Sequence, residues 1–267
     1  MSLVAWRLLR GGATTDRAVL CVDFTQSRVR AQAGFADLAA VLPDRFAVWG
    51  TDEGAWHDTA STWQDPPDRA VAGVFGYCAG AALACALADR VARMTGTAPP
   101  VVLFDPAVVT AQTLLEQFDA ALHGLVGVAP EQDLAAARAD AHTDAGTDAD
   151  LADLDWLAAA LTRRYGDLAR PACAAQQVPE AIADQLCGRL EAYLRYLVRS
   201  AAVPLRSPGA ATVVLSATFQ PLPSLEQHPQ VRTDATQAGL LADAAAAGAA
   251  ARALTGEWAG EWLAAAP

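Results

Sequence analysis

A cysteine flanked by glycines, in the sequence GYCAG, stands between an apolar run and an alanine-rich segment. The run, Val71–Phe75, predicts a strand, and the segment, Ala79–Met94, predicts a helix, so Cys78 falls at the turn between them. A GxCxG pattern in this context is typical of a nucleophile elbow, whose tight turn presents the central side chain above a sheet. Glycines are expected there because the strand and the helix pack closely.

The turn also defines the chemistry expected of this cysteine. A helix N-terminus carries partial positive charge, so it is expected to lower the pKa of the Cys78 thiol from its ordinary value of about 8.5. The backbone N–H of Ala79 is placed to donate to a developing oxyanion. The opposing interpretation is a structural cysteine, since buried cysteines usually behave as small apolar residues, and Cys21 and Cys85 are interpreted in that way.

A carboxylate follows the next predicted strand, Pro99–Pro106, in the sequence PPVVLFDP. Ligands of open α/β sheets bind outside the carboxyl ends of the strands. Asp105 is therefore expected on the same edge as Cys78, where it would act as the acid of a catalytic triad. Its alternative role is local, as a helix N-cap or a turn residue before Pro106.

The segments around these residues alternate between strand and helix patterns. Near-continuous apolar runs favour an α/β fold, with a mainly parallel sheet covered by helices on both faces. The predicted strands are Arg17–Phe24, Arg45–Thr51, Val71–Phe75, Pro99–Pro106, Ala211–Thr218 and Gln230–Ala235, and the predicted helices outside the central region are Ala31–Leu42, Ala79–Met94 and Leu240–Leu263.

The central region breaks this alternation, because its patterns are helical only. We predict a single domain over residues 1–267 with a helical lid inserted at 111–200. An acidic and polar stretch, Ala139–Asp155, interrupts the helices and is interpreted as a solvated loop.

Composition and charge limit the classes of function. The chain has 267 residues, of which 53% are hydrophobic and 18% are charged, and its net charge is −11. A negative surface repels a phosphate backbone, so no nucleic-acid partner is expected. No apolar run reaches the roughly 18 residues of a membrane span, and no signal peptide is recognised, so a cytoplasmic protein without membrane attachment is expected. The five cysteines form no CxxC pair, which indicates neither a disulfide framework nor a zinc site.

Several segments together resemble the type II thioesterases, and the excised thioesterase domains, of non-ribosomal peptide and polyketide assembly lines. The resemblance covers nearly the whole chain and is carried by FGYCAGAALACALA, VVLFDP, TVVLSAT and DATQAGLLAD. It implies an α/β-hydrolase fold and an enzyme of natural-product and antibiotic biosynthesis that takes an acyl group from a carrier-protein phosphopantetheine thioester. It implies no metal and no separate cofactor, because the phosphopantetheine arm arrives with the carrier protein.

The resemblance also assigns roles to individual residues. Cys78 matches the nucleophile, Asp105 the acid, and Ala79 one donor of the oxyanion hole. The second donor is expected in the loop after the first strand, where the family has a Gly- and Pro-rich segment and this chain has TQSRVR. Ser27 is the residue assigned to that role.

The largest departure from the family lies at the catalytic base. The family has a histidine shortly before the final helix, whereas this chain has Gln237 there, within DATQAGLL. The histidines of the chain are His57, His123, His142 and His228. His228, in the loop before the last predicted strand, is the candidate for a replacement base, and its alternative role is that of an exposed loop residue.

A cysteine without a histidine favours acyl transfer over hydrolysis. Cysteine forms some thiolate near neutral pH without help, whereas water needs a base and glutamine cannot accept a proton. The hypothesis is an acyltransferase-like enzyme that takes an acyl or peptidyl group onto Cys78, from a carrier protein or a small acyl thioester, and passes it to an amine or thiol or cyclises it. Two alternatives stay open, namely a hydrolytic editing thioesterase and a non-catalytic protein that binds a carrier protein or an intermediate. Docking of an acidic carrier protein would need a local arginine patch, with Arg163, Arg164 and Arg170 as candidates.

Overall fold

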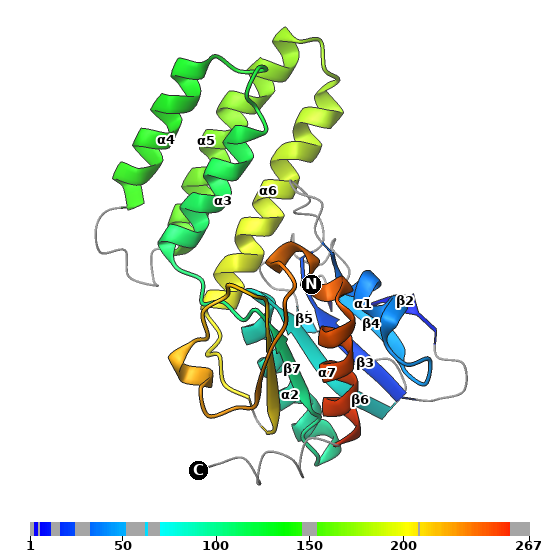
Figure 1. Cartoon of the computed structure of the whole chain (residues 1–267). Helices are drawn as coiled ribbons and strands as arrows, with labels where there is room; N and C mark the ends of the chain where they lie inside the picture. Colours follow the sequence, from blue (N-terminus) through cyan, green and yellow to red (C-terminus); the bar gives the residue numbers. More distant parts are fainter. Residues whose placement is uncertain are drawn as a thin grey trace. The chain divides into compact units, whose positions relative to one another are not determined.

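The computed structural model describes residues 3–4, 6–11, 17–24, 33–51, 62–63, 70–145, 154–207 and 209–256. These residues fall into two compact units (Figure 1). One unit holds the described residues up to Val108 and from Val203 onward, and the other is the helical segment Val109–Ala202. The segment predicted as a lid belongs to the helical unit, and its role as a lid stays a prediction.

A mainly parallel sheet forms the first unit and confirms the predicted fold class. Its seven strands follow the order β2-β4-β3-β6-β7-β8-β9, and each neighbouring pair is parallel except β2 with β4. The strands are β2 (Trp6–Arg10), β3 (Arg17–Val22), β4 (Ala47–Thr51), β6 (Ala70–Tyr77), β7 (Val101–Phe104), β8 (Ala211–Leu215) and β9 (Gln230–Arg232). A separate parallel pair joins β1 (Leu3–Val4) to β5 (Thr62–Trp63).

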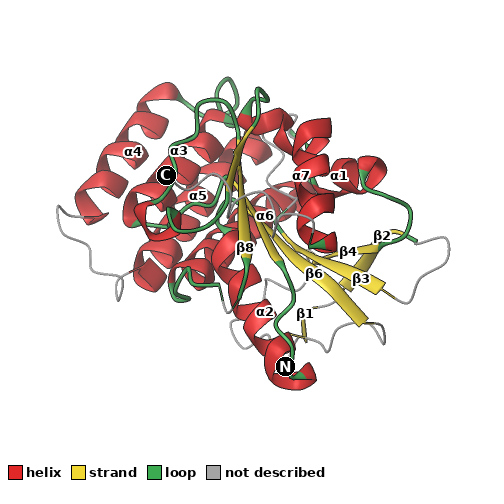
Figure 2. Cartoon of the chain, turned by 60° about the horizontal axis from the view of Figure 1, so that its bottom comes forward, coloured by secondary structure: helices red, strands yellow, loops and turns green. Residues whose placement is uncertain are grey.

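Helices cover both faces of this sheet (Figure 2). On one face lie α1 (Phe35–Val41) and α7 (Ala244–Thr255), and on the other lies α2 (Gly80–Thr95). Two glycines of β6 illustrate the arrangement: a Cβ on Gly73 would collide with Leu254 of α7, and a Cβ on Gly76 would lie 2.7 Å from Cα of Ala81 in α2. Side chains alternate along a strand, so these two positions face opposite sides of the sheet.

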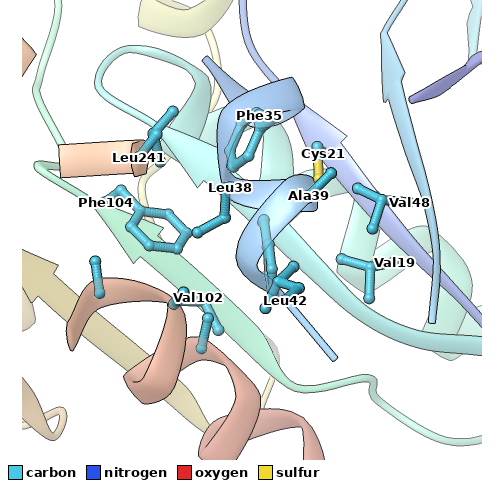
Figure 3. Packing of buried hydrophobic residues seen from close by; sticks show 14 of the residues in the cluster. Val19, Cys21, Phe35, Leu38, Ala39, Leu42, Val48, Val102, Phe104 and Leu241 are labelled. Atoms are coloured by element: carbon cyan, nitrogen blue, oxygen red, sulfur yellow. The ribbon is translucent and has the colours of Figure 1, made fainter. Parts of the chain in front are cut away.

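The core between the sheet and α1 has an aromatic centre. Phe35, Phe75 and Phe104 are almost completely buried, with ring centroids 6.4, 6.0 and 5.7 Å apart. Leu38 and Leu241 pack against the same cluster (Figure 3). Burial of each large apolar side chain contributes roughly 1.5–3 kcal/mol. The cluster therefore anchors the ends of β6 and β7, the two strands that lead to Cys78 and Asp105.

Helices make up most of the described part of the second unit, as the sequence predicts. It contains α3 (Ala111–His123), α4 (Glu131–Ala145), α5 (Leu154–Ala175) and α6 (Glu180–Ala201). The prediction of a polar loop at Ala139–Asp155 is wrong for its first part, because α4 continues to Ala145. An ion pair of 2.9 Å between Arg138 and Asp119 ties α4 to α3. A helix that is polar on most of its surface lacks the apolar periodicity by which helices are recognised.

Two further boundaries differ from the prediction. The final helix is predicted from Leu240, yet the 3₁₀ turn η5 (Gln237–Ala242) comes first and α7 begins at Ala244. The Asp243 side chain accepts a hydrogen bond from Ala246 N at 2.8 Å and so caps the start of α7. β2 is not among the predicted strands, because an edge strand with exposed residues lacks a continuous apolar run.

Candidate active site

Cys78 lies at a strained turn between β6 and α2. Its φ of 51° is in the left-handed region, which a residue with a side chain rarely adopts. Backbone hydrogen bonds hold the turn: Cys78 N donates to Phe104 O at 2.9 Å, and Cys78 O accepts from Ala81 N at 3.1 Å and Ala107 N at 3.2 Å. The Cys78 side chain keeps partial exposure to solvent. This is the geometry expected of a nucleophile elbow.

Gly76 permits the close approach of strand and helix at this turn. A Cβ at this position would lie 2.7 Å from both Ala81 Cα and Ala84 Cβ, and 3.0 Å from the Gly80 carbonyl oxygen. Most of these atoms belong to the backbone of α2, so they could move aside only if the helix moved. The expectation that close packing of strand and helix requires a glycine here is therefore confirmed.

The electrostatic surroundings of the thiol differ from the expectation. The pKa of Cys78 is raised to about 11, and the largest cause is burial, which removes hydration from the thiolate. The Ala79 N–H donates to the sulfur and lowers the pKa, while the negative charges of Asp23 and Asp105 raise it. The predicted lowering of this pKa by the helix N-terminus is wrong as a net effect, because one N–H donor does not offset burial and two nearby carboxylates.

Asp105 directly follows β7 and is completely buried. Its φ is 41°, so a second strained residue lies beside the first. Its Oδ1 accepts from Ser216 N at 2.8 Å and its Oδ2 from Ser216 Oγ at 2.7 Å. Asp105 is not a helix N-cap, because Thr110 caps the next helix, α3. Burial raises the pKa of Asp105, whereas the hydrogen bonds from Ser216 and the positive charge of Arg232 lower it.

Gln237 lies next to the elbow although it is distant in sequence. It begins η5, beyond the carboxyl end of β9, and its side chain is exposed. Its backbone carbonyl accepts a hydrogen bond of 3.1 Å from the hydroxyl of Tyr77, the residue before Cys78. The structure thus places the Gln237 backbone against the Tyr77 side chain, and a glutamine side chain cannot act as a base.

His228 lies toward the amino ends of the strands, whereas Cys78 lies at their carboxyl ends. β9 is parallel to β8, with Gln230 paired to Val213, so a residue that precedes β9 stands at the amino ends of the strands. Cys78 and Asp105, in contrast, follow their strands. The backbone N–H of His228 donates to Leu225 O at 3.0 Å. This placement argues against His228 as a replacement base.

The other predicted residues fall elsewhere. Ser27 and His57 lie outside the described residues, so the second oxyanion donor stays a prediction. His123 ends α3 and His142 lies on α4, 3.5 Å from the Asp119 carboxylate, and both belong to the helical unit. Within the described ranges, no three His, Cys, Asp or Glu side chains form a group that could hold a metal ion. Nor is any described helix long and apolar enough to span a membrane.

Asp23 is a further carboxylate that acts on the Cys78 thiol, and it is not among the residues expected from the sequence. It directly follows β3, the neighbour of β6, and Val22 pairs with Gly76. Its charge reaches the Cys78 thiol and raises the thiol pKa. Asp23 shares with Asp105 the pattern of an acidic residue at the carboxyl end of a strand, and this pattern is the signal by which the sequence marks it.

No protein-family model and no curated protein sequence matches the chain. In structure it is similar, at low identity, to thioesterase domains of non-ribosomal peptide synthetases. The Vlm2 thioesterase domain bound with a dodecadepsipeptide is 12% identical, with 92% of this chain and 96% of that chain covered and a TM-score of 0.45. The NocB thioesterase domain from the nocardicin cluster is 12% identical, with 96% of this chain and 100% of that chain covered and a TM-score of 0.48. The SrfTE domain that cyclises surfactin is 15% identical, with 94% of this chain and 93% of that chain covered and a TM-score of 0.40. The seven-stranded sheet, with helices on both faces and a helical segment between β7 and β8, has the α/β-hydrolase architecture.

Proposed function

We propose that this protein transfers acyl groups in natural-product biosynthesis through a thioester on Cys78. The observation that carries the proposal is the partly exposed Cys78 at a strained turn, with the Ala79 N–H directed at its sulfur. Backbone strain at a single residue, held by surrounding hydrogen bonds, is typical of functional positions. The donor would be an acyl or peptidyl phosphopantetheine thioester on a carrier protein, or a small acyl thioester.

In the first step, the Cys78 sulfur attacks the thioester carbonyl and the pantetheine thiolate leaves. The Cys78 proton passes to the leaving thiolate, so the products are the Cys78 thioester and a free pantetheine thiol. The Ala79 N–H stabilises the negative oxygen that forms on the carbonyl. A thioester replaces a thioester, so the step is nearly balanced in energy and reversible.

In the second step, an amine or thiol acceptor attacks the Cys78 thioester. For an amine, the new bond is an amide, and the amine proton goes to the departing Cys78 thiolate. With a thiol pKa of about 11, the departing thiolate takes up this proton at neutral pH. Water is a weaker nucleophile, and general-base help for its attack is worth roughly 10²–10⁴-fold. The Cys78, Asp105 and Gln237 arrangement therefore favours transfer, or cyclisation by an internal amine.

The alternatives differ in their support. A hydrolytic editing thioesterase needs a base. His228 does not fit this role, because it lies toward the amino ends of the strands and Cys78 lies at their carboxyl ends. A binding protein without turnover is favoured by one observation, the raised pKa of Cys78, which leaves the thiol protonated at neutral pH. Of the arginines suggested for carrier-protein docking, Arg164 and Arg170 pair with carboxylates at 2.9 and 3.2 Å, so their charge is locally offset.

Intact-protein mass spectrometry after addition of acyl-pantetheine thioesters tests the proposal. We expect a mass gain that the Cys78→Ala variant lacks, slow decay of the adduct in buffer, and fast decay when amines are added. His228→Ala should behave like the parent. Rapid Cys78-dependent hydrolysis without an acceptor would support the editing thioesterase instead. No adduct and no turnover across a broad range of acyl groups would support the binding protein.

A further inference from the structure

Both oxygens of the Asp105 carboxyl are held by one residue of the neighbouring strand end. Ser216 follows β8, is almost completely buried, and donates its backbone N–H and its hydroxyl to Asp105 at 2.8 and 2.7 Å. The backbone is joined as well, because Asp105 N donates to Val214 O at 2.9 Å. The orientation of the carboxyl thus depends on where Ser216 stands.

Arg232 in turn holds the loop that carries Ser216. It ends β9, and its Nη1 donates to the carbonyl oxygens of Ser216, Ala217 and Phe219 at 2.9, 3.1 and 2.9 Å. Three carbonyl oxygens that lie close together repel one another unless a positive charge lies between them. The guanidinium therefore stabilises the turn after β8 in the form that points the Ser216 donors at Asp105.

We propose that Ser216 and Arg232 are positioning residues, which hold the Asp105 carboxyl in place at the strand end next to Cys78. The catalytic consequence rests on the proposed acyl transfer through Cys78. The charged or titratable groups that act on Asp105 and Cys78 come from several strands: Cys78 after β6, Arg232 of β9 and Asp23 after β3. Ser216 supplies the neutral donors between them.

The consequence for the site is electrostatic. Donors and positive charge favour the ionised Asp105 carboxyl, which burial disfavours. Ionised Asp105 in turn favours the protonated form of Cys78. Ser216 and Arg232 would thus act on the nucleophile through Asp105, with no contact to the acyl group.

Titration of the Asp105 carboxyl by ¹³C NMR, with Asp105→Asn to assign its signal, is the direct test. We expect Ser216→Ala to raise the pKa of Asp105 by about one to two units, because a hydrogen bond to a charged group is lost. Ser216→Thr keeps the hydroxyl and should restore the parent value. The matched control is Ser200→Ala, which removes another buried serine hydroxyl, one that donates to Tyr196 O within α6, and it should leave the titration unchanged.

Arg232→Gln provides a second variant at an exposed position, should Ser216→Ala fail to fold. It removes the positive charge that favours the ionised carboxylate, so it should raise the pKa of Asp105, by a smaller amount than Ser216→Ala does. An unchanged Asp105 titration in folded Ser216→Ala, or in Arg232→Gln, would overturn the proposal. The titration needs no turnover, so a shifted Asp105 pKa without any Cys78 adduct would support the positioning role and refute the acyl-transfer function.

Discussion

At Cys78, helix geometry and burial act on the thiol in opposite directions. The Ala79 N–H favours the thiolate, whereas burial and the charges of Asp23 and Asp105 disfavour it, and the pKa settles at about 11. A helix terminus contributes typically 0.3–1 kcal/mol to a nearby charge, while a shift of one pKa unit corresponds to about 1.4 kcal/mol. The helix terminus is therefore too weak to decide the ionisation of this residue.

We expect the rate of Cys78 alkylation by iodoacetamide to keep rising up to about pH 11, because only the thiolate reacts. Below that pH the rate should increase about tenfold for each pH unit. Peptide mass spectrometry after short labelling pulses measures the rate at Cys78 separately from the buried cysteines.

In the Asp23→Asn variant, the alkylation rate of Cys78 should level off at a lower pH than in the parent. The reason is that the Asp23 charge raises the thiol pKa. Asp89→Asn, on the outer side of α2, is the matched control, and it should not change the pH at which the rate levels off. A parent rate that levels off near the ordinary thiol pKa of about 8.5 would contradict this account.

At the scale of elements, the contact between β6 and α2 sets the shape of the elbow. A methyl group at position 76 would press on the backbone of α2 at Ala81. Gly188 of α6 offers a contrast, because a Cβ there would meet nothing within 4 Å. The same chemical change should therefore have opposite effects at the two glycines.

We expect Gly76→Ala to lower the free energy of unfolding by about 1–3 kcal/mol, the usual cost of overpacking. Gly188→Ala should raise it by about 0.5–1 kcal/mol, since alanine loses less backbone entropy in a helix. Urea denaturation of both variants beside the parent measures the difference. Equal stability of the two variants would mean that α2 adjusts freely and that Gly76 is not required by packing.

At the scale of the whole molecule, two buried thiols and the partly exposed Cys78 share one property, a pKa raised by the loss of hydration. Burial raises the pKa of Cys21 well above its ordinary value and that of Cys85 to about 12, and Cys78 follows at about 11. A raised pKa in the folded state means that the folded protein binds more protons than the unfolded chain above about pH 8.5. These thiols thus contribute stability below that pH, and it is lost as the pH rises through their folded values.

We expect the free energy of unfolding to fall above about pH 9, by up to about 1.4 kcal/mol per pH unit for each such thiol. Cys85→Ala removes one of them and should make the decline shallower by that amount. Urea midpoints measured from neutral to alkaline pH give both slopes. A decline that is unchanged in Cys85→Ala would assign the alkaline loss of stability to other groups.

The sequence predicts the strand and helix order well wherever apolar residues repeat regularly. β3, β6 and β7 are buried runs, and the elbow between β6 and α2 carries its own glycine signal. Elements without that signal were missed or misplaced, such as the edge strand β2 and the polar end of α4. Their positions depend on neighbours, an antiparallel partner for β2 and ion pairs for α4, rather than on local patterning.

The sequence by itself determined the α/β class, the strand-to-helix turn at Cys78 and the position of Asp105 at the end of the next strand, because these follow from short-range patterns at strand ends. Only the tertiary structure decided the state of the site. Ser216 meets Asp105 across 111 positions, and Tyr77 meets Gln237 across 160. The order of strands in the sheet, with β3 and β7 on either side of β6, places two carboxylates around the thiol. Burial and charge from distant segments set a pKa, and no local pattern records which segments will become neighbours.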